Sequence, residues 1–173
     1  MPWQTTLPNV SFISANNWNL NGTTQDLSNI LSNISATQTL QEFTGWTGLE
    51  GVTSLEKAFA NASRLTTVSI TNANMPALKT TANMFQGASK ISSIDFTGWS
   101  GITSESVIKG MFDNMSGVSP TLTVSNDEIG NWIKTEFLSK FPSGTVTYAG
   151  ANHIETVREA VSVDEPEATA EAP

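Results

Sequence analysis

Near its middle the chain reads Val52-Thr53-Ser54-Leu55-Glu56-Lys57-Ala58-Phe59-Ala60-Asn61-Ala62-Ser63-Arg64-Leu65-Thr66-Thr67-Val68-Ser69-Ile70, and parts of this stretch return along the sequence. The run from Phe59 to Leu65 returns as Phe85-Gln-Gly-Ala-Ser-Lys-Ile91, and a longer variant begins at Phe112. The corresponding positions are 25, 26, 27 and 25 residues apart, at Ile34, Phe59, Phe85, Phe112 and Phe137. A period of this length is typical of proteins built from small repeated units.

Each period predicts one short strand and one short helix. Apolar residues alternate with Thr, Ser, Glu or Asp in the predicted strands, which span 40–43, 65–70, 91–96, 122–124 and 146–148. The helices should lie just before the anchor positions. For example, Thr53-Ser54-Leu55-Glu56 has the capping-box pattern, and Leu55, Ala58 and Phe59 would then share one helical face.

The last predicted helix is the longest. It begins with a second capping box, Ser125-Asn126-Asp127-Glu128, whose acidic residues suit the positive end of the helix dipole. Its apolar stripe consists of Ile129, Trp132, Ile133, Phe137 and Phe141. Pro142 then stops it. We therefore predict a C-terminal capping helix over 126–141.

Together these units predict an α/β repeat fold, a short leucine-rich-repeat-like solenoid with one short strand and one short helix in each unit of about 25 residues. A unit of that size cannot bury its own apolar face, so neighbouring units must share a core. We expect an N-terminal capping unit over 1–33, leucine-rich-like repeats over 34–150 and an acidic tail over 151–173. The predicted core residues are Ile34, Phe59, Phe85, Phe112 and Phe137.

The composition excludes several classes of chemistry. The 173 residues include no cysteine and one histidine, which excludes disulfides and cysteine catalysis and makes a histidine-based metal centre hard to assemble. The net charge of −8 disfavours binding along nucleic acid. We see no apolar run of about 18 residues and no classical signal peptide. The sequence therefore predicts no cofactor, no metal, and no nucleic-acid or membrane partner.

The stretch from Val52 to Ile70 resembles the unit of the BspA-like leucine-rich repeats of bacterial surface proteins, almost position by position. The shared pattern is a Thr, a Phe six residues later, a small residue with Ser, and then an alternating apolar run. Ala62 and Ala88 stand where the family usually has Cys, so a small residue is kept. The resemblance covers about residues 34–125 and implies a repeat fold that serves adhesion and interaction with varied ligands.

We predict a non-enzymatic protein-interaction or structural module. Surface members of the family usually carry an export signal and an anchor or long repeat array, whereas this chain shows four or five units and no signal. We therefore expect a component of a larger assembly, such as a phage capsid decoration or fibre, located in a virion or on an extracellular surface. Its partners would be protein subunits, and a homo-oligomer is a further option. The alternative is a bacterial cell-surface adhesin fragment that binds a host protein or glycan.

The outward row of the predicted strands is the candidate partner-binding surface. It comprises Glu42, Thr67, Ser69, Ser93, Asp95, Thr123, Ser125, Thr145 and Thr147. Glu42 and Asp95 have a spacing that formally suits glycoside hydrolysis, but no pocket signature accompanies them, so we predict no enzyme. Thr residues at 121, 123, 145 and 147 alternate as in an ice-binding surface, which is a minor alternative function. Glu42, Ser93 and Asp95 interrupt the threonine array on the other strands.

Residues 151–173 carry six acidic side chains and one arginine, so much of the negative charge lies at this end. Such a composition is typical of disordered segments. Two interpretations stay open: a neighbouring subunit holds the tail, or the tail packs on its own chain.

Overall fold

The computed structural model describes residues 17–32, 42–117, 119–149 and 154–158. In this part of the chain it contains two β-sheets, one α-helix and a short 3₁₀ helix, Glu105–Val107. The strands are β1 (Gln25–Asp26), β2 (Glu42–Thr44), β3 (Val52–Ser54), β4 (Thr67–Ser69), β5 (Ser93–Asp95), β6 (Thr121–Ser125), β7 (Thr145–Ala149) and β8 (Ile154–Arg158), and the α-helix is α1 (Glu128–Lys140).

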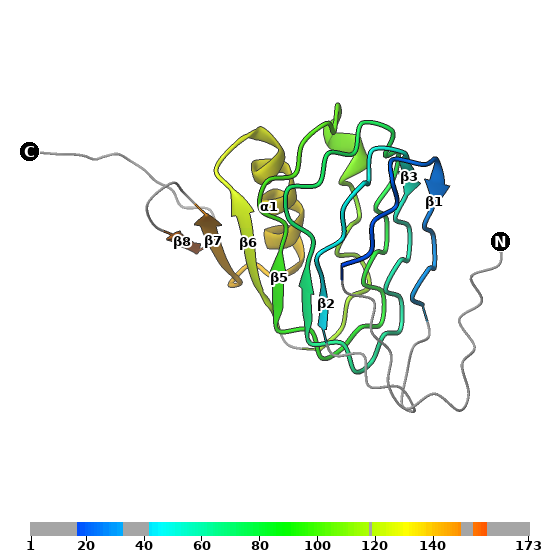
Figure 1. The fold of residues 1–173 in the computed structure, drawn as a ribbon. Helices are drawn as coiled ribbons and strands as arrows, with labels where there is room; N and C mark the ends of the chain where they lie inside the picture. The colour runs from blue at the N-terminus through cyan, green and yellow to red at the C-terminus, as the bar shows by residue number, and fades with distance from the viewer. Residues whose placement is uncertain (1–16, 33–41, 118, 150–153, 159–173) are drawn as a thin grey trace, which may run out of the picture.

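The larger sheet has the strand order β2-β4-β5-β6-β7-β8. Its first five strands are parallel, and β8 turns back antiparallel to β7. The apolar centres of the parallel strands are in register, so that Val68 pairs with Ile94, Ile94 with Leu122, and Leu122 with Val146. Figure 1 shows these strands following one another from β2 to β8.

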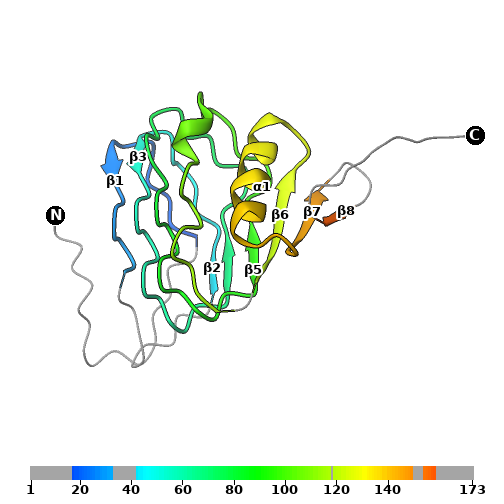
Figure 2. The ribbon, with the colours of Figure 1, turned by 180° about the vertical axis from the view of Figure 1, so that it is seen from behind.

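The smaller sheet consists of β1 and β3, which are parallel. It lies at the end of the molecule farthest from β7 and β8 (Figure 1). Seen from behind, α1 runs beside β6 (Figure 2). One cluster of buried residues joins both sheets and the helix, and it includes Val52, Val68 and Phe137.

The predicted leucine-rich-repeat-like solenoid is wrong. The protein is a small α/β domain with two sheets, whose strands are parallel except for β8, and a single α-helix among the described residues; it is not a series of strand–helix units. The helices expected before Phe59 and Phe85 do not form, because residues 56–61 and 82–87 are turns. Only a three-residue 3₁₀ helix precedes Phe112.

Backbone geometry explains why residues 55–61 are not helical. Lys57 and Asn61 have φ angles of 55° and 59°, in the left-handed region that a right-handed helix cannot accommodate. The Lys57 N–H donates to the carbonyl of Ala82, and the Phe59 N–H donates to that of Met84. These donors are thus used by a neighbouring segment and not by carbonyls four residues earlier, as an α-helix requires.

The aromatic residues of the sequence period form a buried column. The ring centroids of Phe59 and Phe85 are 5.6 Å apart, those of Phe85 and Phe112 are 5.9 Å apart, and those of Phe112 and Phe137 are 5.3 Å apart. All four rings are at most 1% exposed. Ile34, the first predicted core position, lies outside the described residues.

The single helix begins two residues later than the capping box suggested. Its N-cap is Asp127, whose carboxylate accepts a hydrogen bond from the Gly130 N–H at 2.8 Å. Ser125, the predicted cap, is the last residue of β6. Ile133 and Phe137 from the predicted stripe are buried, whereas Ile129, Trp132 and Phe141 are partly buried.

The structure describes only part of each predicted terminal region. Most of the predicted N-terminal unit (1–33) and of the acidic tail (151–173) lies outside the described residues. Two strands do fall inside these regions: β1 belongs to the first and β8 to the second. β3 is a strand at the position where the capping-box pattern from Thr53 to Glu56 predicts the start of a helix.

Candidate interaction surface

The larger sheet buries every second residue of its strands. Val68, Ile94, Leu122 and Val146 have no exposed surface, whereas their neighbours along the described strands are polar and at least partly exposed. This alternation follows from the two-residue period of a strand. The sheet therefore presents polar side chains on the face opposite to the core.

These outward positions form two rows across the sheet. In the first row, Glu42, Thr67, Ser93, Thr121 and Thr145 are paired in register. In the second row, the paired residues are Thr44, Ser69, Asp95, Thr123 and Thr147. We call the two rows the hydroxyl face, because Ser and Thr make up most of it.

The predicted surface residues all lie on strands of this sheet. Eight of them belong to the two rows, and Ser125 pairs with Ala149 at the end of β6. The side chain of Glu42 is outside the described part of the structure. The sequence prediction missed Thr44 and Thr121, because it ended one strand at Phe43 and began another at Leu122; the alternation with their neighbours was the available signal.

Several side chains near the end of this face are held by hydrogen bonds. The Thr123 and Thr147 hydroxyls are 2.7 Å apart, and the Asp95 carboxylate accepts from the N–H and the hydroxyl of Thr97 at 3.0 and 2.6 Å. The Ser125 hydroxyl accepts from the Gly98 N–H at 2.8 Å. Short side chains that are already fixed lose little conformational entropy when a partner covers them.

The two carboxylates considered for hydrolysis do not share a row. Glu42 is in register with Ser93 in the first row, whereas Asp95 belongs to the second row with Thr44. The Asp95 carboxylate accepts both of its hydrogen bonds from Thr97. Among the carboxyl groups that the structure describes, a displaced pKa is found elsewhere: hydrogen bonds from Ser28 hold the pKa of Asp26, on β1, below its ordinary value.

The threonine pattern of an ice-binding surface is confined to one end of the sheet. Thr121 pairs with Thr145, and Thr123 pairs with Thr147, on β6 and β7. On β5 the corresponding positions are Ser93 and Asp95. An array of threonine alone is therefore only two strands wide within the described sheet.

We also searched the structure for metal sites and membrane-spanning helices, and compared the chain with known proteins. In the ranges that the structure describes, no group of three or more His, Asp or Glu side chains is placed to hold a metal ion. No helix in these ranges is long and apolar enough to cross a membrane. Comparison of the chain with protein-family models, curated proteins and solved structures gives no match.

Proposed function

We propose that the protein is a non-enzymatic interaction module whose hydroxyl face docks onto protein subunits, further copies of this chain included. The observation that carries the proposal is the register of the two rows, which places short polar side chains side by side across the four parallel strands β4, β5, β6 and β7. The phage-virion setting and the BspA-like resemblance stay predictions.

The chemistry of the face supports docking. Asp95 is the only charged residue among its described side chains, so a partner could cover the face at a small cost in desolvated charge. Interfaces with well-placed polar groups need to bury about 800 Å² on each partner for stable association. Hydroxyl groups can both donate and accept hydrogen bonds, which suits a partner that presents backbone or amide groups.

A surface substitution tests this proposal. We expect the purified chain to associate in a concentration-dependent way in size-exclusion chromatography with light scattering. Thr121→Arg places a long charged side chain in the first row, between Ser93 and Thr145, and should shift the mass toward that of the monomer. Thr103→Arg is the matched control, because Thr103 is also exposed but belongs to neither sheet.

The opposite outcomes are equally clear. A monomer at every concentration, or equal association by the two arginine variants, would contradict docking through the hydroxyl face to copies of the chain. A monomer that binds immobilised fibronectin, and loses this binding in Thr121→Arg alone, would instead support the adhesin alternative.

A further inference from the structure

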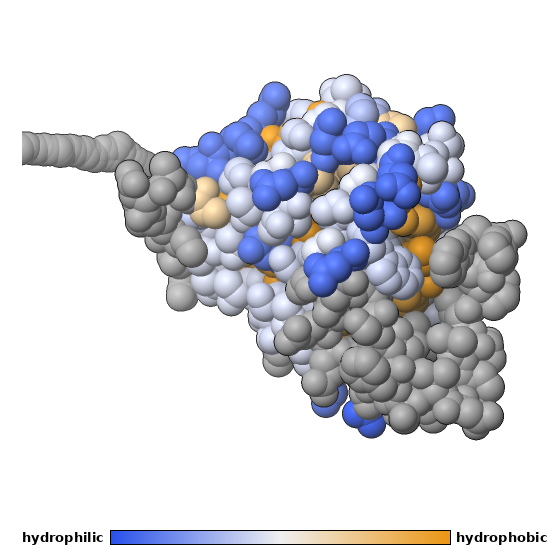
Figure 3. Space-filling model, viewed as in Figure 1, coloured by the Kyte–Doolittle hydropathy of each residue, from blue (hydrophilic) through white to orange (hydrophobic). Residues whose placement is uncertain are grey.

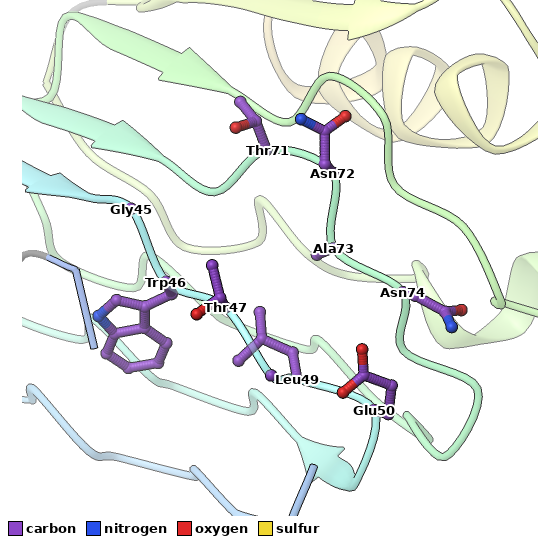
Figure 4. A pocket seen from close by; sticks show the side chains of 10 residues that line it. Gly45, Trp46, Thr47, Leu49, Glu50, Thr71, Asn72, Ala73 and Asn74 are labelled. Atoms are coloured by element: carbon purple, nitrogen blue, oxygen red, sulfur yellow. The ribbon is translucent and has the colours of Figure 1, made fainter. Parts of the chain in front are cut away.

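A cleft lies between two segments that follow strands of the larger sheet. One wall is formed by residues 45–50, after β2, and the other by residues 71–74, after β4. Figure 4 shows the two segments side by side, with Thr47, Leu49 and Glu50 of the first segment on the side that faces the second. The cleft has a volume of about 330 Å³, near the lower end of the range of about 300–1,000 Å³ that is common for small-molecule sites.

Each wall is hydrogen-bonded on the side away from the cleft. The Thr47 N–H donates to the Trp18 carbonyl at 2.8 Å, and the Leu20 N–H donates to the Thr47 carbonyl at 3.0 Å. On the other side, the Ser100 N–H donates to the Ala73 carbonyl at 2.9 Å. Both walls are therefore fixed in place by their outer neighbours.

The corresponding bonds are missing across the cleft. Residues 47–50 and 71–74, all of which are described, exchange no backbone hydrogen bond. An extended segment directs successive backbone groups to opposite sides, so the inner side of each wall offers both N–H donors and C=O acceptors. Backbone groups in a protein are nearly always paired with something, which leaves solvent or a ligand as the partner here.

Asparagine side chains do not fill the cleft. In Figure 4, Asn72 and Asn74 point away from residues 45–50. The Oδ1 atom of Asn72 lies 2.3 Å from the place where a Cβ on Gly98 would be, and that of Asn74 lies 2.4 Å from the place of one on Gly101. Because Gly98 and Gly101 have no side chains, there is room for both amides on the outer side of this wall.

The side chains that remain at the cleft are nearly neutral. Thr47 and Glu50 are exposed on the first wall, and Thr71 is partly exposed on the second. Glu50 is the only ionisable residue among those lining the cleft, and none of them is Lys or Arg. The indole of Trp46 is buried and is stacked on Trp18, with centroids 5.3 Å apart, so it offers little ring surface to a ligand.

We propose that this cleft binds one neutral, hydroxyl-rich unit, such as a single sugar ring. A sugar hydroxyl donates and accepts at once, which matches walls that offer backbone N–H and C=O groups, threonine hydroxyls and one carboxylate. An anion would be repelled by Glu50. An ammonium group would use the carboxylate and the carbonyls but would leave the N–H donors without a partner.

The test is an NMR titration of the ¹⁵N-labelled full chain with four separate probes, D-glucose, D-galactose, N-acetyl-D-glucosamine and glycerol, up to tens of millimolar. At least one probe should shift the amides of both walls. Glu50→Gln should weaken this binding about tenfold, as expected for loss of a charge-assisted hydrogen bond. Thr47→Leu should abolish it by filling the mouth of the cleft.

Two matched controls separate binding from general effects. Thr103→Leu makes the same change as Thr47→Leu at an exposed residue outside the cleft, and Glu105→Gln removes an exposed charge outside the cleft; both variants should bind like the original chain. Absence of wall shifts with all four probes would overturn the proposal. So would shifts that persist in Thr47→Leu, or wall shifts produced by spermidine and by none of the four probes.

Discussion

Asparagine occupies nearly all of the left-handed backbone positions that carry a side chain in the described part of the chain. Seven of the eight described non-glycine residues with positive φ are Asn, and the eighth is Lys57. Asn tolerates this region better than other residues with a side chain, because its short amide can bond locally. The abundance of Asn, which in the sequence looks like a property of composition, therefore has a conformational role at particular turns.

Gly98 shows why glycine alternates with asparagine at these turns. Its φ angle is +79°, and a Cβ would meet the Asn72 side chain at 2.3 Å. Asn72 is itself left-handed, with a φ angle of 57°. A second side chain at the facing position would clash with the first, so one of the two facing residues has to be glycine.

Phe85 provides the residue-scale prediction. It has no exposed surface, and its ring lies between those of Phe59 and Phe112. Phe85→Ala should lower the free energy of unfolding by about 3–5 kcal/mol, because it removes a large buried side chain and leaves a cavity. Urea denaturation followed by tryptophan fluorescence measures the change. Phe85→Leu, which keeps more of the volume, should lose less; a loss below about 1 kcal/mol for Phe85→Ala would contradict the importance of the column.

At the scale of elements, strands were easier to predict than helices. The alternation around Val68 and Ile94 placed β4 and β5 inside the predicted ranges. The spacing of Leu55, Ala58 and Phe59 suggested a helix, but the same spacing arises here from a turn that buries three apolar residues. Local sequence could not distinguish the two, because the deciding hydrogen bonds go to residues about 25 positions later.

Of the two candidate sites, one could be predicted from local sequence and the other could not. Most of the hydroxyl face followed from the two-residue alternation, which local sequence contains. The cleft did not, because it depends on which segments pair: Thr47 bonds to Trp18 and Ala73 bonds to Ser100, while the two inner sides remain apart. Nothing in the residues of either wall taken alone indicates that separation.

Backbone hydrogen bonds join successive turns of the chain, and at the last of these turns the Glu136 side chain of α1 takes the place of a backbone acceptor. The N–H of Lys57 donates to the Ala82 carbonyl, and that of Asn83 donates to the Gly110 carbonyl. The next donor, the Gly110 N–H, bonds at 3.0 Å to the Glu136 carboxylate. The carbonyls of α1 are used within the helix, so a side chain has to supply the acceptor.

The element-scale prediction compares two substitutions at Glu136, which is mostly buried and also lies 3.6 Å from Lys109. Glu136→Ala should cost about 1–3 kcal/mol, because the Gly110 N–H loses its partner. Glu136→Gln keeps an acceptor and should retain most of that stability. The exposed pair of Lys140 and Asp113 gives the control, since Lys140→Ala should cost at most about 1 kcal/mol. Equal losses for the Ala and Gln variants would show that charge, and not the hydrogen bond, matters.

At the scale of the whole molecule, the two ends of the core differ. At the helix end, Phe137 covers the ring of Phe112, and Phe141 follows at 5.2 Å from Phe137. In the sheet, β8 pairs antiparallel with β7 and ends the parallel series. At the opposite end, Figure 3 shows apolar surface near β1 on a face that is otherwise mostly hydrophilic or neutral.

The whole-molecule prediction concerns the end closed by α1. A chain that stops at Ser125 lacks α1, β7 and β8, so the ring of Phe112 is uncovered and the Gly110 N–H loses Glu136. It also leaves β6 as an open edge, which favours aggregation. We therefore expect this variant to lose the cooperative thermal transition in circular dichroism and to elute as aggregate.

The matched control is a chain that stops at Arg158, which keeps every described element and should melt cooperatively. A soluble chain that stops at Ser125 with a cooperative transition would show that the strands and turns before β6 form a stable core without the helix. Loss of the transition in both chains would instead place part of the closure after Arg158. Only failure of the shorter chain alone assigns the closing role to α1, β7 and β8.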